Sequence, residues 1–314
     1  MTAAPKSAEK CSLASAMLQR GSLSFAMLFS IGLAATTTAA GGTPTSTLAA
    51  ASLCDDDGEW RLVWRDEFDS AGLNTTTWTV PLGTGNSFGR EANVTAADTY
   101  VDDGNLVLRS RVLPGSGGKN WTTGAAITHA RGSPAPGNVG ASWRYGRFCV
   151  RAKLPGSAAA GASQGLWPAH WMAPADHARH CGYNEIDIME MINGDGRAHA
   201  TYWYWGPGGG GPPGSNCSGP PVRAGPSGTA PVPDFSAAYH EYAVEWTPTR
   251  LAFFVDGAAY ASFDGAGTLP VNDHYMMLNT AVGGGWPGSP NASTESPAFH
   301  LIDYVRVAQK PDYG

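Results

Sequence analysis

A ten-residue stretch that carries three carboxylates, residues 184–193, places the strongest constraint on how this chain can fold. The residues between the acids are apolar and either β-branched or long, which is typical of a β-strand. Side chains on a strand alternate between its two faces, so Glu185 and Asp187 share one face while Ile186 lies on the other. The stretch therefore predicts a strand with one acidic face and one apolar face.

The third acid of this stretch does not follow the alternation. Strict alternation would put Glu190 on the face opposite Glu185. One extra residue at positions 188–189, a β-bulge, would turn Glu190 back to the acidic face. Because bulges are common next to active sites, the spacing itself indicates a functional site.

Two glutamates on one face, with an aspartate between them, match the chemistry of glycoside hydrolysis with retention. That reaction uses two carboxyl groups roughly 5–5.5 Å apart, one as nucleophile and one as acid/base. Asp187 would lie close to both Glu185 and Glu190, and like charges favour the protonated form that a general acid needs. The alternative is an acidic face that binds a cation or is only solvated.

The composition favours a strand-rich protein that acts on a neutral partner. At 314 residues the chain can hold one large all-β domain or two domains of ordinary size. The charged fraction is 15%, and 41 glycines, 23 prolines and 11 tryptophans indicate many turns and aromatic contacts. A net charge of -6 argues against nucleic acid or an anionic membrane as partner, since both need a basic patch. A neutral polysaccharide fits this charge, because sugars are bound by stacking.

The acidic stretch, Glu-Ile-Asp-Ile-Met-Glu, resembles the signature of glycoside hydrolase family 16. Its bulged form, E-x-D-x-x-E, resembles the laminarinases, which are endo-1,3-β-glucanases; the form E-x-D-x-E belongs to lichenases and xyloglucan transglycosylases. The resemblance implies Glu185 as nucleophile, Asp187 as its assistant and Glu190 as acid/base. It also implies an all-β fold, a concanavalin A-like jelly roll whose two stacked antiparallel sheets form a sandwich with a concave substrate cleft.

Seven blocks in the family's order extend the resemblance over roughly residues 58–309, and we assign residues 58–310 to a catalytic domain. The implied function is retaining endo-hydrolysis of β-1,3-glucan, such as laminarin, by double displacement. Other family activities stay open: hydrolysis of mixed-linkage glucan or galactan, and transglycosylation. A rival from another class is a β-glucan-binding recognition protein. We expect a monomer.

Four residues are expected in the cleft. Trp167 and Trp171 are four residues apart on a predicted strand, so they share a face on which sugars could stack; the alternative is core packing. Asn279 and Trp286 lie in a block that resembles the family's L-N-x-A-V-G-G-x-W-P-G, and the resemblance implies that both reach the substrate.

The chain departs from the family pattern at several positions. Trp203 takes the place of a histidine that hydrogen-bonds near the catalytic pair, and we expect it to add a stacking wall. An alanine in residues 123–128 replaces an arginine that binds sugar. Arg90 or Asn93 could touch a sugar, and His170, where phenylalanine is usual, has no explanation from the sequence.

The resemblance also implies a structural calcium ion. Glu67, the Gly104 carbonyl and Asp303 correspond to positions that hold calcium in many family members. Oxygen ligands suit calcium. The alternative is ordinary turn chemistry and surface charge. The reaction itself requires no cofactor, because the two carboxyl groups supply its chemistry.

The N-terminal region predicts secretion. Residues 1–40 have the order of a signal peptide: basic residues, an apolar run at 23–35 and small residues at a cleavage site. The alternative is an uncleaved anchor that makes a type II membrane protein. Residues 41–57 have the composition of a linker.

Glycosylation sequons and cysteines agree with an extracellular location. The chain has five Asn-x-Ser/Thr sequons, at Asn74, Asn93, Asn120, Asn216 and Asn291. Once the leader is removed four cysteines remain, Cys54, Cys149, Cys181 and Cys217, with three possible pairings. Proximity favours a bond between Cys181 and Cys217, and free thiols are the alternative.

Overall fold

The computed structural model describes the chain from residue 51 onward, apart from several loops. The described residues are 51–84, 88–115, 120–130, 138–159, 161–175, 184–204, 222–223, 228–265 and 269–313. Ala49–Gly314 forms one compact unit. The predicted signal peptide or anchor lies outside the described residues. Within them, no helical segment has the length and apolar character of a membrane span.

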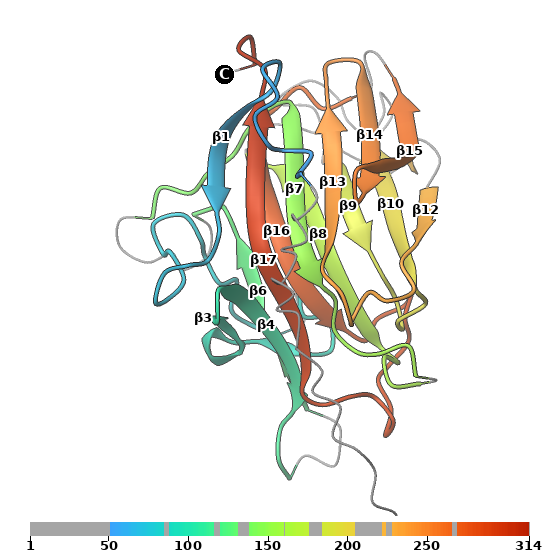
Figure 1. Ribbon diagram of the computed structural model, residues 1–314. Helices are drawn as coiled ribbons and strands as arrows, with labels where there is room; N and C mark the ends of the chain where they lie inside the picture. Colours follow the sequence, from blue (N-terminus) through green and yellow to red (C-terminus); the bar gives the residue numbers. More distant parts are fainter. Residues whose placement is uncertain are drawn as a thin grey trace, which may run out of the picture. The chain divides into compact units, whose positions relative to one another are not determined.

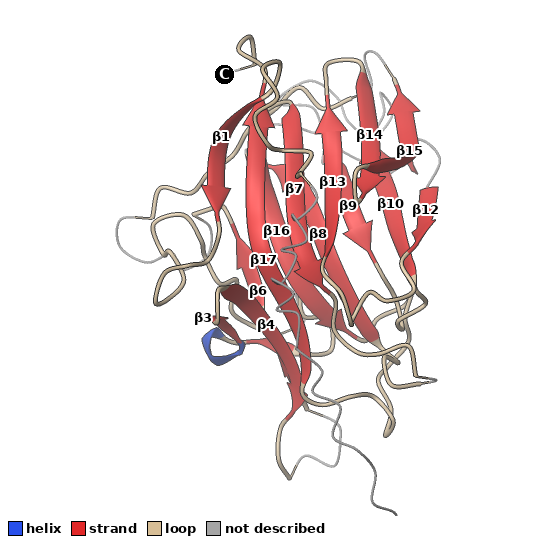
Figure 2. Cartoon of the chain, in the orientation of Figure 1, coloured by secondary structure: helices blue, strands red, loops and turns tan. Residues whose placement is uncertain are grey.

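Two β-sheets lie face to face in this unit, which confirms the predicted all-β sandwich (Figures 1 and 2). The only helix among the described residues is a short 3₁₀ turn, η1 (Ala96–Asp98). We term the seven-stranded sheet the cleft sheet; its order is β11-β10-β9-β8-β16-β6, with β12 also paired to β10. Its strands are β6 (Ala125–Ile127), β8 (Leu166–Pro174), β9 (Glu185–Glu190), β10 (Arg197–Tyr204), β11 (Val222–Arg223), β12 (Gly228–Pro231) and β16 (His274–Val282).

The ten-stranded sheet, termed the back sheet, covers the other side of the core. Its order is β15-β14-β13-β7-β17-β4-β5-β2; β1 also pairs with β17, and β3 with β4. All of its pairs are antiparallel except β2 with β5, which is parallel. Its strands are β1 (Arg61–Asp66), β2 (Asn93–Val94), β3 (Thr99–Asp102), β4 (Asn105–Val112), β5 (Trp121–Thr123), β7 (Gly146–Lys153), β13 (His240–Trp246), β14 (Arg250–Val255), β15 (Ala258–Asp264) and β17 (Ala298–Gln309).

The core between the sheets is built by the period-two pattern of the strands. Ile186 and Ile188 of β9 and Leu278 of β16 face Val150 of β7 and Val305 of β17, and all five are fully buried. Each such side chain contributes about 1.5–3 kcal/mol when it leaves water. Because the apolar residues of β9 are held inside, its acids are left for the outer face of the cleft sheet.

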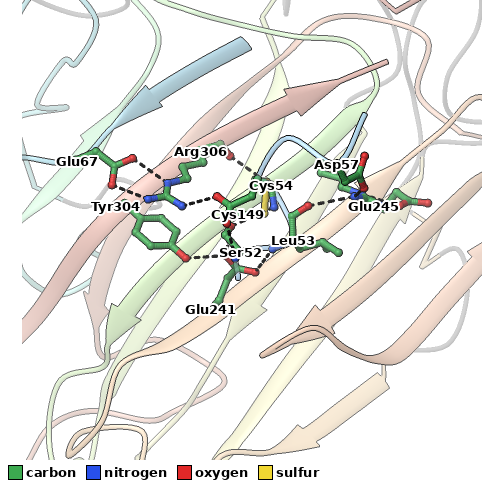
Figure 3. Close-up of a disulfide and its surroundings, with 12 residues drawn as sticks. Ser52, Leu53, Cys54, Asp57, Glu67, Cys149, Glu241, Glu245, Tyr304 and Arg306 are labelled. Carbon is green, nitrogen blue, oxygen red and sulfur yellow. Dashed lines mark hydrogen bonds and ion pairs between the residues drawn. A yellow bond between two sulfur atoms is a disulfide. The ribbon is translucent and has the colours of Figure 1, made fainter. Parts of the chain in front are cut away.

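Residues 51–57 belong to the folded domain and are not a linker, which corrects the prediction for this part of 41–57. Cys54 forms a disulfide with Cys149 of β7 and is fully buried (Figure 3). The backbone N–H of Leu53 donates to Oε1 of Glu241 on β13 at 2.9 Å. These bonds hold the segment on the outer face of the back sheet. The bond between Cys54 and Cys149 excludes free thiols at these two positions. The predicted bond between Cys181 and Cys217 lies outside the described residues.

Candidate active site

The three predicted catalytic carboxylates line one cavity of about 450 Å³ on the outer face of the cleft sheet. Asp187 is 3% exposed, whereas Glu185 and Glu190 are partly exposed. Glu185 and Glu190 reach solvent on either side of the buried Asp187, so a bound polymer can contact both glutamates. The arrangement is therefore open to a long chain.

The strand register shows how Glu190 reaches this cavity. On the β10 side, Glu190 lies opposite His199 and Asp187 lies opposite Thr201. Three steps along β9 are thus matched by two steps along β10. One residue of β9 at positions 188–189 has no counterpart, which confirms the predicted β-bulge.

The neighbouring strand on the other side identifies the extra residue. Met189 lies opposite His170 of β8, and Asp187 lies opposite Trp171, so Ile188 is skipped. Ile188 and Met189 are both buried in the core between the sheets. Two consecutive inward side chains shift the phase of the strand, and the next residue, Glu190, turns outward as a consequence.

Two tryptophan side chains hold the carboxylates. Nε1 of Trp167 on β8 donates to Oε1 of Glu190 at 3.0 Å. Nε1 of Trp203 on β10 donates to Oδ2 of Asp187 at 3.0 Å. Hydrogen bonds to an ionised acceptor are among the stronger ones in proteins. Trp203 therefore supplies a donor beside the catalytic pair where the family's histidine is missing, in addition to lining the cavity as predicted.

Trp171 and Asn279 fix one another in the cavity floor. Nε1 of Trp171 donates to Oδ1 of Asn279 at 2.7 Å, and Nδ2 of Asn279 donates to the Phe88 carbonyl at 3.0 Å. Both side chains are nearly buried, and Trp171 packs in a small apolar cluster with Tyr275 and Met277. Trp171 therefore has both of the roles that the sequence left open: it lines the cleft, and it packs in an apolar cluster.

Trp286 forms an exposed wall of the cavity. The residue is 44% exposed, and its ring lies edge-on to that of Trp167 at 5.4 Å between centroids. It also lies edge-on to His199 at 5.3 Å, whose Nε2 is 2.7 Å from Oδ2 of Asp195. An exposed aromatic ring that is held from two sides is a ready stacking surface for a sugar.

Comparison with known proteins agrees with this geometry. A model of glycosyl hydrolases family 16 matches residues 122–306, which is more than half of the chain and includes every strand that lines the cavity. The chain belongs to glycoside hydrolase family 16. It is therefore a glycoside hydrolase, and the resemblance drawn from the acidic stretch is confirmed.

Similar family 16 proteins include a β-glucanase of Rhodothermus marinus, 31% identical over 81% of this chain and 86% of its own length. A keratan-sulfate endo-1,4-β-galactosidase of Sphingobacterium multivorum is 29% identical over 81% of this chain, but the match spans only 56% of that protein. Among solved structures, the laminarinase from Rhodothermus marinus is 28% identical, with a TM-score of 0.61 over 80% of this chain and 98% of that one.

The family 16 cavity also contains residues that the sequence analysis missed or left open. Ala169 and Ala281 line it, and each is two residues from a predicted cleft residue on the same strand face, so the period-two rule could have found them. Thr201 lines it for the same reason, two positions before Trp203. Of the pair Arg90 and Asn93, Arg90 lines the cavity and Asn93 does not.

The carboxylates expected to hold calcium do not fit that role. Glu67 accepts from Nε and Nη2 of Arg306 at 2.8 and 2.9 Å, and Asp303 is paired with Arg151. Gly104 lies in the turn between β3 and β4 with φ of 69°. Across the part of the chain that the structure describes, no three His, Cys, Asp or Glu side chains are grouped to hold a metal. The arginine pairing favours the alternative, turn chemistry and surface charge.

His170, unexplained by the sequence, faces the core and pairs with a second histidine. Its Nε2 is 3.0 Å from Nε2 of His300 on β17, and Nδ1 of His300 is 3.2 Å from Oγ1 of Thr280. Both imidazoles are fully buried. Burial holds the pKa of His170 well below its usual value, and it lowers the pKa of His300 to about 3. The pair links β8 of the cleft sheet, the neighbour of the catalytic strand β9, to β17 of the back sheet.

Proposed function

We propose that this family 16 enzyme cleaves β-1,3-linkages inside β-glucan chains with retention, by double displacement. The observation that carries the proposal is the bulge at Ile188, which brings Glu190 to the face and the cavity of Glu185. Support also comes from the β-glucanase and laminarinase relatives.

In the first step, Glu185 attacks the anomeric carbon and forms an ester bond to it. Glu190, protonated at the start, gives its proton to the glycosidic oxygen as the bond between that oxygen and the anomeric carbon breaks. The neighbouring negative charges of Glu185 and Asp187 favour the protonated form of Glu190 that this step needs. The leaving sugar departs with its hydroxyl group restored.

In the second step, Glu190 is ionised and acts as base. It takes a proton from a water molecule, whose oxygen attacks the anomeric carbon and breaks the ester to Glu185. Two inversions at one carbon give net retention. Asp187 stays buried between the two glutamates, and its bond from Trp203 keeps its charge in one place. No cofactor takes part, because the two carboxyl groups and water account for every bond and proton.

The cavity lining suits a neutral polysaccharide. Trp167, Trp203 and Trp286 offer aromatic faces to sugar rings, and Ala169 and Ala281 leave room between them. The keratan-sulfate endo-1,4-β-galactosidase relative keeps a second substrate class, a β-galactoside polymer, open for the same site. A panel of laminarin, lichenan and agar distinguishes these substrates: we expect reducing ends from laminarin first, and faster release from agar would favour a galactan hydrolase.

Variants of the two glutamates test the catalytic assignment. Glu185→Ala and Glu190→Ala should each lower kcat on laminarin by at least about 1,000-fold. With an aryl glycoside whose leaving group needs no proton, Glu190→Ala should still form the glycosyl-enzyme, and added azide should restore turnover. The matched control is Glu245→Gln, a strand glutamate on the back sheet that pairs with Arg147. Full activity in either alanine variant would overturn the roles.

We also propose that the enzyme is secreted. The signal-like order of residues 1–40 supports this, as does the Cys54–Cys149 disulfide, since disulfides persist in oxidising compartments. N-terminal sequencing of protein from the culture medium should find a start after residue 40. A chain that stays on membranes with its N-terminus intact would favour the type II anchor.

A further inference from the structure

Among the described residues that line the cavity, Arg90 is the one with a lysine or arginine side chain, and it carries a positive charge. Its backbone is left-handed, with φ of 56°. Such a backbone is unfavourable for arginine and persists only where the surroundings hold it. Here the N–H of Glu91 donates to the Val282 carbonyl at 2.9 Å, and the N–H of Val282 donates to the Gly89 carbonyl at 3.2 Å. The chain is thus pinned to β16 in a shape that turns Arg90 towards the cavity.

The guanidinium of Arg90 lies over a ring that touches the predicted acid/base. Its Cζ is 5.1 Å from the centroid of the Trp167 ring, within the range of a cation–π interaction. Nε1 of the same ring donates to Oε1 of Glu190 at 3.0 Å. Gly284 packs against both side chains, since a Cβ there would lie 3.6 Å from Arg90 and 3.7 Å from Trp167. Cation, indole and carboxylate therefore form one chain of contacts.

A cation on the face of an indole has two effects on a carboxylate at its N–H. It draws electron density from the ring, which makes the N–H a stronger donor, and its own charge favours a negative group nearby. Both effects favour the ionised form of Glu190. They oppose the charges of Glu185 and Asp187 on the same strand, which favour the protonated form.

Two other groups near Glu190, His199 and Tyr260, do not supply this balance. His199 lies opposite Glu190 on β10, but its Nε2 faces the carboxylate of Asp195 at 2.7 Å. Tyr260 of β15 lies on the core side and donates to the Ile188 carbonyl at 3.3 Å. Burial, with a smaller effect of Glu190, raises the pKa of Tyr260, so it remains neutral.

We propose that Arg90 is a positioning residue for Glu190, which acts through the Trp167 ring to orient the carboxylate and to favour its ionised form. Glu190 must be protonated in the first step and ionised in the second, so an acid held too firmly in one state would slow the other step. The charge of Arg90 offsets the effect of the two neighbouring acids, Glu185 and Asp187, on the protonation of Glu190. The inference rests on the proposed function, because that function makes Glu190 the acid/base.

Two readouts test this role with four single variants and with the double variant Arg90→Asn/Trp167→Phe. Arg90→Asn removes the charge and suits a left-handed backbone, whereas Arg90→Lys keeps the charge. Trp167→Phe keeps a ring but removes its N–H. Arg144→Asn is the control, an arginine over Tyr145 that does not line the cavity. The readouts are the pH profile of kcat/KM on laminarin and the titration of Glu190 without substrate by carbon-13 NMR, with Glu190→Gln to assign the signal.

Arg90→Asn should move the alkaline limb of the profile and the Glu190 titration to higher pH by about 0.5 unit, as expected for the loss of one charge across a partly solvated site. Kcat should fall several-fold while KM changes less than about twofold. Trp167→Phe should shift both midpoints in the same direction, and the double variant should shift them by less than the sum, because the two residues act in series. Arg90→Lys and Arg144→Asn should leave the midpoints near those of the wild type.

Other results would overturn the assignment. A rise in KM of several-fold with unmoved midpoints would make Arg90 a direct sugar contact instead. Additive shifts in the double variant would show that Arg90 does not act through Trp167. If laminarin is not cleaved at all, the proposed function fails, yet the NMR titration still reports whether Arg90 controls Glu190.

Discussion

The buried histidine pair determines how the stability of this enzyme should change in mild acid. His170 and His300 are fully buried and share a bond of 3.0 Å between their Nε2 atoms, in which one imidazole donates and the other accepts. The accepting imidazole must be neutral, and burial favours the neutral form of both rings. In the unfolded chain each imidazole is in water and binds a proton below a pH of about 6.5.

The size of the effect follows from these values. The folded pKa of His300 is about 3, below its unfolded value, so the unfolded chain binds the extra proton and stability falls as pH drops through 6.5. Each pH unit costs about 1.4 kcal/mol, so His300 alone costs about 2.7 kcal/mol at pH 4.5. His170, whose pKa is also lowered by burial, adds to this cost. Above pH 6.5 the pair adds no pH dependence.

The double variant His170→Phe/His300→Leu removes both groups and retains the apolar volume. Urea unfolding at pH 7.0, 5.5 and 4.5, followed by tryptophan fluorescence, gives the free energy of unfolding of each protein. The wild type should lose at least about 2.5 kcal/mol more than the variant between pH 7.0 and 4.5, which is the share of His300 alone. The surface carboxylates are the same in both proteins, so their effect cancels in the difference. Parallel curves would refute the reasoning, because the histidines would then not be neutral in the folded core.

Three further predictions follow from the structure. The double variant Cys54→Ala/Cys149→Ala, which opens a loop of 95 residues, should lower the free energy of unfolding by about 2–5 kcal/mol without changing kcat, because the disulfide lies on the back sheet; urea unfolding and a laminarin assay check this. Trp203→Phe, which removes the donor to Asp187, should lower kcat by about 10-fold or more, and an unchanged kcat would contradict the role of that bond. Trp286→Ala should raise KM about 3–10-fold with kcat within about twofold, since a stacking surface is lost; a loss confined to kcat would show a different role.

The catalytic strand was predictable because its signals are local. The bulge follows from the spacing of Glu185, Asp187 and Glu190, and period-two alternation correctly put Trp167 and Trp171 on one face. These inferences need only a strand and its phase.

Features that depend on distant parts of the chain were missed. The segment around Cys54 has the composition of a linker, and its bond to the distant Cys149 of β7 shows that it belongs to the folded domain. His170 has no meaning until β17 brings His300 across the core. Arg90 depends on a left-handed backbone that is held by β16, which no local pattern reports. The arginine that pairs with Glu67 lies 239 residues later, so no local pattern reports that pairing.

The central claim, that the kinked strand β9 presents Glu185 and Glu190 to one glycosidic bond for double displacement, is tested most directly by proton NMR during the first minutes of laminarin hydrolysis. Retention predicts that the β-anomer of the new reducing end appears first, and that the α-anomer grows only as mutarotation proceeds. An initial α-anomer would mean inversion, in which water attacks directly and no ester to Glu185 forms. That result would contradict the assignment of Glu185 as nucleophile.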